Sequence, residues 1–512
     1  MLSSGQSFAM PGHPEPVERQ ARPADRSWLW LWLWLWFWPC LALLLGACTT
    51  PVLPPVPPQA QAGSLPAHFK SAAPAQLDDA SDNAAFGWSA FADPVLDGLM
   101  ARALQANPQV EIAAARLQQA RAALRASASA RSPQAALNAS AGRQGGPLVN
   151  AAGNEGTLLT ANIGLAYEAD FFGRLAQGED AARWDARSRA AAWQAARLLV
   201  QAEVALTYLT LQTLDAECAV VQQALQARRE GLRLVEQRWQ RGALPETAVL
   251  RERAEAATAE AEFAGFAPRR AALVNGLALL LGESATTFHW PAADNADAAQ
   301  PPMLPRVPAG LPSGWLARRP DVAAADLAET AARARSGAAR AAWWPSFALT
   351  ASGGQASARL AELVLAGSRA WGLGLLTTLP LFDGGRRAAN AAQIDATLQL
   401  ESAQRRALVL QAFKEVEDQL GAVQALAERQ ALQAQATAAL RRSRALAESR
   451  QRQGLASRLD VLAARRAEAQ ALQIGLQLHA ALAQATVGLV KALGGDGSAS
   501  TGLAAAERLN GD

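Results

Sequence analysis

The stretch Leu159–Arg174 has the sequence LTANIGLAYEADFFGR, and the period of its apolar pattern changes at its end. From Leu159 to Phe171, apolar residues alternate with polar or small ones, which predicts a strand with one apolar face. Gly173 then opens a run rich in Ala, Leu and Gln that continues to Gln240. At 1.5 Å per residue, this run predicts a helix about 100 Å long, far longer than a globular domain needs.

The flanking segments complete a larger unit. The Ala-rich run 99–131, interrupted by Pro108, predicts helix before the strand. Segment 134–142 predicts a partner strand with one face formed by Ala135, Leu137, Ala139 and Ala141. The Gly- and Asn-rich segment 142–156 connects the two strands as a hairpin. Gly242 predicts a left-handed cap at the end of the long helix, after which a second helix returns along it.

This unit occurs twice. A shift of 212 positions carries Gly173-Arg174 onto Gly385-Arg386 without a gap on either side. The same shift matches Asn107-Pro108 with Arg319-Pro320, Ala120-Arg121-Ala122 with Ala332-Arg333-Ala334, Pro133 with Pro345, Glu203-Val204 with Glu415-Val416, Gly242 with Gly454, Val249-Leu250 with Val461-Leu462, and Gly282 with Gly494. One constant offset indicates an internal duplication. Because 212 is even, the apolar faces of the strands stay in phase.

The second copy predicts the same elements. One strand carries Phe347, Leu349 and Ala351. Its partner carries Trp371, Leu373, Leu375, Thr377, Leu379 and Leu381. Ser357 and Gly367 are expected in the connecting loop, a helix over 386–453, and a returning helix between Gly454 and Gly494. The Ala richness of the long helices permits close interhelical packing, which favours a coiled-coil-like wall.

The N-terminal region resembles a lipoprotein leader. An apolar stretch begins at Trp28 and ends in Leu45-Gly46-Ala47-Cys48, which looks like a bacterial lipobox. It predicts a signal peptide over 1–47 and a mature chain acylated at Cys48; the alternative is a transmembrane anchor that contains a cysteine. Acidic residues among the preceding arginines leave open a start downstream of Met1. Thr49 after the cysteine favours sorting to the outer membrane by analogy.

Proline-rich segments divide the remainder. Segment 48–83 predicts an extended tether, and 291–312 a linker between the copies. The first repeat is expected over 84–290, with its hairpin near 133–171. The second is expected over 313–496, with its hairpin near 345–382, followed by a tail over 497–512.

Composition and motifs exclude several function classes. A net charge of +3 without a basic block interleaved with aromatics argues against nucleic-acid binding. Removal of Cys40 and acylation of Cys48 leave Cys218 alone, so no intrachain disulfide is expected. His68, His289 and His479 are scattered and are interpreted as surface or core residues, and the fourth histidine, His13, lies in the leader. No HExxH, P-loop or Gly-x-Ser-x-Gly motif occurs, and the Gly-rich segment 494–497 follows a helix. We therefore expect no catalytic, cofactor-binding or metal-binding residue, and four methionines give no support for copper or silver specialisation.

Four strands per chain cannot close a barrel, and open sheet edges are not tolerated in a bilayer. Other chains must therefore complete the sheet. Three copies with twelve strands are the smallest convenient closed solution with an open lumen, although the strand count alone does not choose three.

Separated motifs resemble the TolC/OprM-like outer-membrane efflux family, in particular its NodT-like lipoproteins of RND pumps. The motifs, in family order, are Phe86-Gly87-Trp88 with Phe91 and Asp93-Pro94, Glu168-Ala169-Asp170-Phe171-Phe172-Gly173-Arg174, Leu316-Ala317-Arg318-Arg319-Pro320-Asp321, Leu379-Pro380-Leu381-Phe382-Asp383-Gly384-Gly385-Arg386 and Ala492-Leu493-Gly494-Gly495. The resemblance covers about 84–496. It implies a mainly α protein with a β-barrel portion: a homotrimeric, twelve-stranded outer-membrane barrel continuous with a periplasmic α-helical tunnel. It also implies an adaptor protein and an inner-membrane pump as partners, and a channel rather than an enzyme.

The resemblance places function at the two helix–helix turns. Arg241-Gly242-Ala243-Leu244 and Gly454-Leu455-Ala456-Ser457 resemble the tips that meet the adaptor. The alternative is that these turns are only helix caps. In relatives, an acid six places after the glycine helps form the constriction; Asp460 keeps it, whereas the first copy has Ala248. Asp460 is thus the expected gate, with Arg458 or Arg450 from a neighbouring helix as its ion-pair partner. The alternative is that Arg450, Arg452 and Arg458 form a solvated charge run.

A rival interpretation is a lipid-anchored, non-conducting helical scaffold or adhesin, which predicts helix without in-phase lipid-facing strands. A lipid-anchored enzyme is a weaker rival. The transported solute does not follow from the sequence, because in such systems specificity resides in the pump.

Overall fold

The computed structural model describes residues 69–70, 86–145, 155–291, 302–305, 307 and 318–496. The chain divides into two units, 1–58 and 59–512, and all described residues belong to the second. The predicted signal peptide 1–47, Cys48 and the tail 497–512 lie outside the described residues, as do most of the tether and of the linker.

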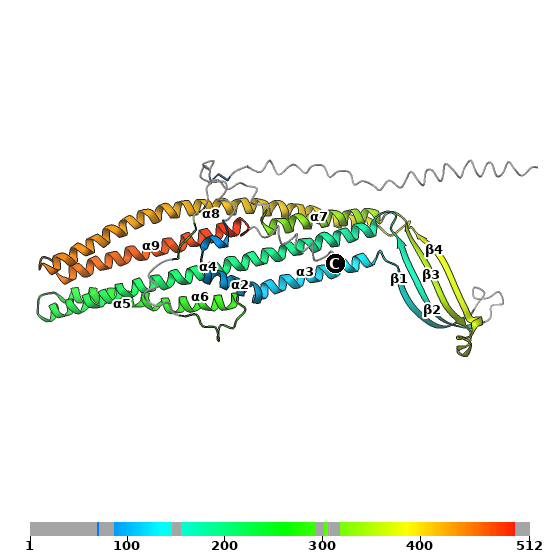
Figure 1. Ribbon diagram of the computed structural model, residues 1–512, viewed down its shortest axis with the longest axis horizontal. Coiled ribbons are helices and arrows are strands. Elements are labelled where there is room, and N and C mark those ends of the chain that lie inside the picture. The colour runs from blue at the N-terminus through cyan, green and yellow to red at the C-terminus, as the bar shows by residue number, and fades with distance from the viewer. Residues whose placement is uncertain are drawn as a thin grey trace, which may run out of the picture. The chain divides into compact units, whose positions relative to one another are not determined.

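Four antiparallel strands form one sheet (Figure 1). Their order is β1 (Gln134–Gln144), β2 (Gly156–Ala169), β3 (Ser346–Ser357) and β4 (Arg369–Thr378). Both predicted hairpins are present, and they join through β2 and β3. Between β3 and β4 lie two 3-10 helices, η4 (Leu360–Glu362) and η5 (Ala366–Ser368). Among the described residues, β1 and β4 are the two edge strands of the sheet.

Some strand ends differ from the prediction. Strand β2 ends at Ala169 rather than Phe171, because the chain turns there and the Phe171 N–H donates to the Ala169 carbonyl at 3.0 Å. Strand β4 ends at Thr378, so Leu379 and Leu381 lie beyond it. Pro380 explains this end, since it has no N–H to donate to a ladder. Ser357 is the last residue of β3 instead of lying in the loop.

The odd-numbered positions of all four strands share one face. The register places Leu137 opposite Ile163, Ile163 opposite Gly353, and Gly353 opposite Trp371. Leu137 is 78% exposed and Trp371 81% exposed, so the helices of the same chain do not cover this apolar face. The opposite face carries the small and polar residues Asn138, Asn162, Gly164, Thr350, Ser352, Gly372 and Gly374.

The remaining regular elements of the described chain are helices. After the 3-10 helix η2 (Trp88–Phe91), they are α2 (Pro94–Ala106), α3 (Pro108–Ser129), α4 (Arg174–Gln240), α5 (Glu246–Ala264), α6 (Phe266–Leu280), α7 (Pro320–Ala341), α8 (Arg386–Arg452) and α9 (Arg458–Ala492). The break predicted at Pro108 is confirmed: proline suits a first helical position, where its missing N–H costs nothing. The Asn107 side chain caps α3 by accepting from the Gln109 N–H at 2.8 Å.

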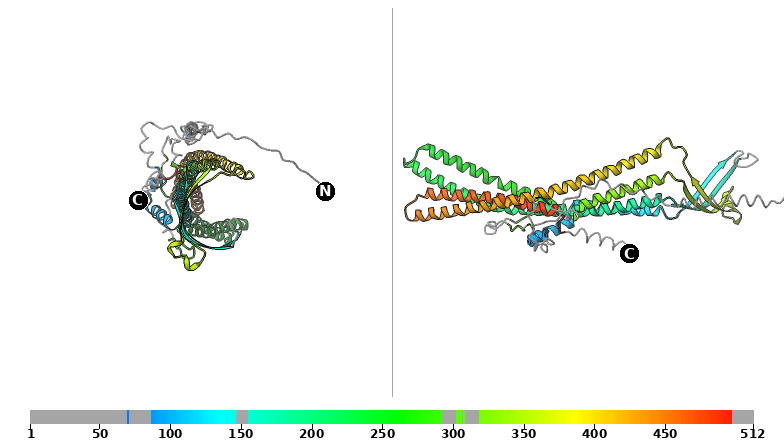
Figure 2. Two further views of the ribbon diagram at one scale, coloured as in Figure 1. Left: turned by 90° about the vertical axis from the view of Figure 1, so that its right-hand side faces the viewer. Right: turned by 90° about the horizontal axis from the view of Figure 1, so that it is seen from above.

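The long helix α4 lies at the centre of the helical packing. It packs against α3, α5 and α6 of its own repeat and against α7 and α9 of the other, whereas α8 packs mainly against α7 and α9. Viewed along the helices, the described elements of 59–512 form an open arc (Figure 2). Helix α4 is the one described helix long and apolar enough to cross a membrane by length and composition, and 56% of its most apolar window is buried inside the chain. A helix in a protein core has the same property.

The main core lies where the repeats meet. Its buried residues include Val204 and Tyr208 of α4, Val416 of α8, and Val487 and Val490 of α9. A smaller cluster of Leu214, Val221 and Phe266 holds α6 against α4. The two repeats therefore share one core within the described residues.

The repeats differ at their returning helices. The first has two helices, α5 and α6, meeting at Gly265, whereas the second has the single helix α9. Pro268 accounts for the break, because its ring would clash with the Ala264 carbonyl and it cannot donate to it. The position 212 residues later is Ala480, which continues a helix without penalty.

Candidate functional site

The two predicted tips are tight turns with the same backbone. At the first, Gly242 has φ 73°, and the Ala243 N–H donates to the Arg238 carbonyl at 2.9 Å. At the second, Gly454 has φ 75°, and the Leu455 N–H donates to the Arg450 carbonyl at 2.8 Å. These are Schellman caps, which require a residue free to adopt positive φ. The glycine caps predicted from the sequence are confirmed.

The second tip has a polar cap that uses the predicted gate residue. The Ser457 N–H and hydroxyl each donate to Asp460 Oδ2 at 2.7 Å, and the Asp460 N–H donates back to the Ser457 hydroxyl at 3.2 Å. This capping box satisfies donors that a helix start leaves without partners. The side-chain and backbone hydrogen bonds from Ser457 hold the pKa of Asp460 below its ordinary value. Its carboxylate is therefore charged at neutral pH.

The first tip lacks this device. Pro245 and Ala248 occupy the positions of Ser457 and Asp460, and no side chain caps α5. Leu244 is half-buried, whereas Leu455 is 73% exposed. The two tips of one chain therefore have the same backbone but different charge and exposed apolar surface.

Arg458 is held within its own chain. Its Nε and Nη2 donate to the two carboxylate oxygens of Glu230 on α4, at 2.6 and 3.0 Å. These hydrogen bonds lower the pKa of Glu230. Within one chain the structure thus brings Arg458 to Glu230, and Asp460 to Ser457, rather than pairing Arg458 with Asp460.

An ion pair at an equivalent position also joins the two helices of each helical hairpin. Arg253 of α5 bonds Glu236 of α4 at 2.8 Å, and Arg465 of α9 bonds Glu448 of α8 at 2.9 Å. These pairs stand at equivalent positions of the two repeats. The hairpins that carry the tips are therefore built alike.

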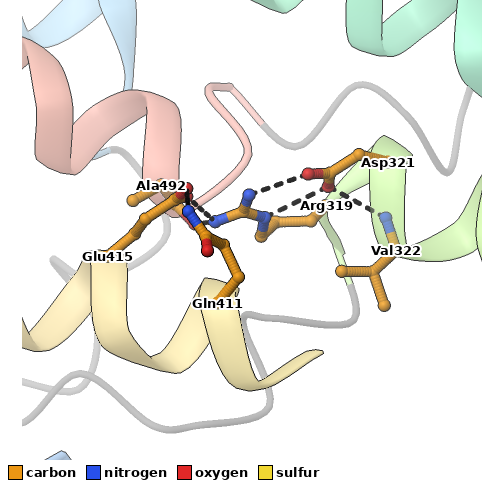
Figure 3. A network of polar contacts seen from close by, with 6 residues as sticks. All are labelled: Arg319, Asp321, Val322, Gln411, Glu415 and Ala492. Carbon is orange, nitrogen blue, oxygen red and sulfur yellow. Dashed lines mark hydrogen bonds and ion pairs between the residues drawn. The ribbon is translucent and has the colours of Figure 1, made fainter. Parts of the chain in front are cut away.

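The Arg319 network is a feature whose role sequence reasoning missed (Figure 3). Arg319 is 5% exposed, and its guanidinium donates to Asp321 Oδ2 at 2.7 Å, to Glu415 Oε2 at 2.8 Å and to the Ala492 carbonyl at 3.2 Å. Burial alone would raise the pKa of Asp321, but the bonds and charge of Arg319 outweigh it and lower that pKa. The network joins the start of α7, the middle of α8 and the end of α9.

The offset of 212 positions relates Arg319 to a residue of the first repeat with a similar contact. At the equivalent position of the first repeat, Asn107 donates from its side chain to the Leu280 carbonyl at 2.8 Å. Leu280 is the equivalent of Ala492. Asn107 and Arg319 therefore have the same structural role. Asn107 joins the end of α6 to the start of α3, and Arg319 joins the end of α9 to the start of α7.

An aromatic cluster at the helix–sheet junction was also missed. The Phe172 and Trp344 rings stack with centroids 5.2 Å apart, Phe171 meets Phe347 edge-on at 5.3 Å, and the Arg387 guanidinium lies 4.9 Å from the Trp343 ring centre. Its members come from both repeats and are far apart in sequence, which is why a local pattern does not show them.

The described residues offer no candidate metal-binding group. None of their His, Cys, Asp and Glu side chains form a group of three that could hold a metal ion. His289 and His479 lie apart, and His68 falls outside the described part of the chain. The small and polar face of the sheet lines a cavity of about 500 Å³.

The family model described as outer membrane efflux protein matches this chain twice, over residues 99–283 and 311–495. The chain belongs to the outer membrane efflux protein family. This efflux protein is 32% identical to outer membrane protein OprJ of Pseudomonas aeruginosa over 432 residues, which cover 83% of this chain and 88% of OprJ. It is 31% identical to the cation efflux system protein CusC of Escherichia coli over 459 residues, covering 89% of this chain and 97% of CusC.

Solved structures give the same result. The open state of the MtrE outer membrane channel of Neisseria gonorrhoeae superposes on the efflux protein with a TM-score of 0.72 and 28% identity, covering 85% of this chain and 96% of MtrE. The protein is thus an outer-membrane channel component of an efflux system.

Proposed function

We propose that three copies of this efflux protein form a twelve-stranded outer-membrane barrel continuous with a periplasmic helical tunnel. The trimer conducts solutes passively from an RND-type inner-membrane pump and its adaptor. The acylated Cys48 anchors each copy to the outer membrane.

One observation supports this proposal most directly: in the part of the chain that the structure describes, the sheet has two unpaired edge strands. Strands β1 and β4 are both edges, and lipid offers no partner for their N–H and C=O groups. Pairing β4 of one copy with β1 of the next satisfies both edges and continues the odd-numbered apolar face around the barrel. The polar, Gly-rich face then lines the lumen. The aromatic cluster at the junction suits the lipid–water boundary, where barrels carry aromatic girdles.

The tips fit the opposite end of the conduit. Both turns project short loops with little side-chain bulk, and Leu455 adds an exposed apolar contact for the adaptor. Three copies of Asp460 near the axis would repel one another in restricted water unless each is paired. Arg458 is already bonded to Glu230, so Arg450 of a neighbouring copy is the proposed partner, and this pair would hold the second tip closed as the candidate gate. Relatives of similar identity export different cargo by name, cations for CusC and solvents for SrpC of Pseudomonas putida. We therefore assign cargo selection to the pump.

Conductance tests the proposal. Purified full-length protein added to planar lipid bilayers should give discrete current steps, and native mass spectrometry should give a trimer. A lipid-anchored scaffold or adhesin predicts an intact bilayer without steps. Absence of steps from protein that is trimeric in detergent would exclude the conducting function.

A further inference from the structure

The two long helices are equally long but unequally covered. Helices α4 and α8 each contain 67 residues at the constant offset, yet 19 residues of α4 are buried and only 3 of α8. The reason is that α4 has neighbours from both repeats, whereas α8 packs mainly on α7 and α9. Helices α7 and α9 of the second repeat cover one side of α4. Among the described residues, no helices of the first repeat cover the corresponding side of α8 to the same extent.

The uncovered positions of α8 are apolar. Leu400 is 54% exposed, Leu410 62%, Leu432 58% and Leu446 51%. Their equivalents on α4 (Ser188, Leu198, Val220 and Leu234) are all at least partly covered. A row of exposed leucines is unusual on a helix face that contacts only solvent. We therefore infer that another helix covers this flank of α8 in the assembled protein.

The contacts between the two repeats within one chain indicate which surface covers α8. If repeats alternate around a ring, each contact from the first repeat to the second recurs between copies at positions 212 residues away. Ser188 of α4 donates to the Ala324 carbonyl of α7 at 2.8 Å. The equivalent positions are Leu400 on α8 and Ile112 on α3, both apolar and 54% and 43% exposed.

A second contact between the repeats, near the tips, also has an exposed apolar residue at an equivalent position. A Cβ at Gly231 of α4 would lie 3.9 Å from Leu462 of α9, which is 1% exposed. The equivalents are Ser443 on α8 and Leu250 on α5, and Leu250 is 54% exposed. Two contacts at opposite ends of α8 thus leave exposed apolar partners on α3 and α5.

The third contact is an ion pair whose signs are exchanged. Glu230 of α4 pairs with Arg458 of α9. The equivalent positions hold Arg442 on α8 and Glu246 on α5. Both are exposed, and neither has an ion-pair partner among the described residues. Leu400 and Arg442 are six heptads apart, so a supercoiled helix presents both on one face.

We propose that the flank of α8 formed by Leu400, Arg442 and Ser443 packs against α3 and α5 of a second copy, with Arg442 paired to Glu246 of that copy. This assignment rests on the proposed trimer and defines its subunit contact. The charges at these four positions also disfavour contacts between two copies of the same repeat. A contact between two first repeats would place Glu230 against Glu246, and one between two second repeats would place Arg458 against Arg442, both repulsive.

Site-directed cross-linking tests this contact in the full-length protein. In a Cys218→Ala background, Glu246→Cys with Arg442→Cys should give dimer- and trimer-sized bands after treatment with a short bifunctional thiol reagent. The matched control is Glu230→Cys with Arg458→Cys, the pair already in contact within one chain, which should give only a monomer-sized band. Each single variant should give no ladder.

A charge exchange provides a second measurement. Glu246→Arg alone should lower the temperature at which the trimer dissociates in detergent, and Glu246→Arg with Arg442→Glu should restore it. The native mass of each sample separates the possible failures. A trimeric mass without a cross-linked ladder would overturn the contact alone, whereas a monomeric mass would overturn both the contact and the proposed trimer.

Discussion

The buried guanidinium of Arg319 shows how one residue joins three helices. It bonds Asp321, Glu415 and the Ala492 carbonyl, so its loss leaves two carboxylates without their charged partner and a buried carbonyl without this donor. Arg319→Ala should destabilise the fold by about 1–3 kcal/mol, the cost of leaving buried polar groups unsatisfied. Urea unfolding followed by circular dichroism measures this. Arg319→Lys keeps the charge but not the forked geometry, and an intermediate loss is expected; equal stability of all three proteins would contradict the role.

His479 of α9 is a residue whose burial makes stability depend on pH. It is 8% exposed, and burial lowers its pKa below the ordinary value of about 6.5. The unfolded chain therefore takes up a proton at higher pH than the folded chain does. Stability should fall as pH drops below about 6.5, until the folded form is protonated too. The midpoint of thermal unfolding, recorded between about pH 7.5 and about pH 5.5, should show this decline. A His479→Gln variant should show a flatter profile; an identical slope would contradict the assignment.

At the scale of elements, the second tip combines a helix cap with the candidate gate. Asp460→Ala should raise single-channel conductance without loss of the trimer, because it removes the carboxylate proposed to pair with Arg450 of a neighbouring copy and to hold the tip closed. Asp460→Asn is the sharper variant, since an amide oxygen can still accept from Ser457 while the charge is gone.

Planar-bilayer recordings distinguish the two roles of Asp460. Raised conductance in both variants supports an electrostatic gate, whereas unaltered conductance and salt dependence in Asp460→Asn would leave Asp460 as a helix cap only. Ala248→Val, at the equivalent position of the first tip, should change little.

The sheet gives a second prediction at this scale. Leu165 lies on the odd-numbered face proposed to contact lipid, and Thr160 lies on the opposite face, where its hydroxyl is 2.7 Å from that of Ser140. An arginine near the midplane on the lipid side of a barrel costs roughly 2 to 4 kcal/mol. Leu165→Arg should therefore reduce the amount of protein in outer-membrane fractions far more than Thr160→Arg. Equal amounts would exclude a membrane barrel.

At the scale of the whole molecule, the lipid anchor is tested at Cys48. The sequence Leu45-Gly46-Ala47-Cys48 predicts acylation of its thiol. Cys48→Ser should abolish labelling by a palmitate analogue and leave an unprocessed precursor. Labelling that persists in this variant would refute the lipobox interpretation.

Local patterns predicted most elements because their causes are local. Strand alternation, the glycines with positive φ and the proline at the start of α3 each depend on a few neighbouring residues. Where prediction was wrong, as at Leu379 and Leu381 beyond β4, Pro380 had ended the ladder. The break at Gly265 does not follow from the repeat offset, because Pro268, which causes it, has Ala480 as its equivalent in the second copy.

The order of the elements and their duplication follow from the amino-acid sequence alone, since periodicity, capping residues and a constant offset can be read along the chain. Which faces of these elements are covered depends on the tertiary fold. Helices α4 and α8 have equal lengths, yet one is a core helix and the other an edge, and Arg458 turns to Glu230 rather than to Asp460. Burial and pairing depend on which distant segments become neighbours, and the free energy of those contacts belongs to the assembled fold rather than to any stretch of chain.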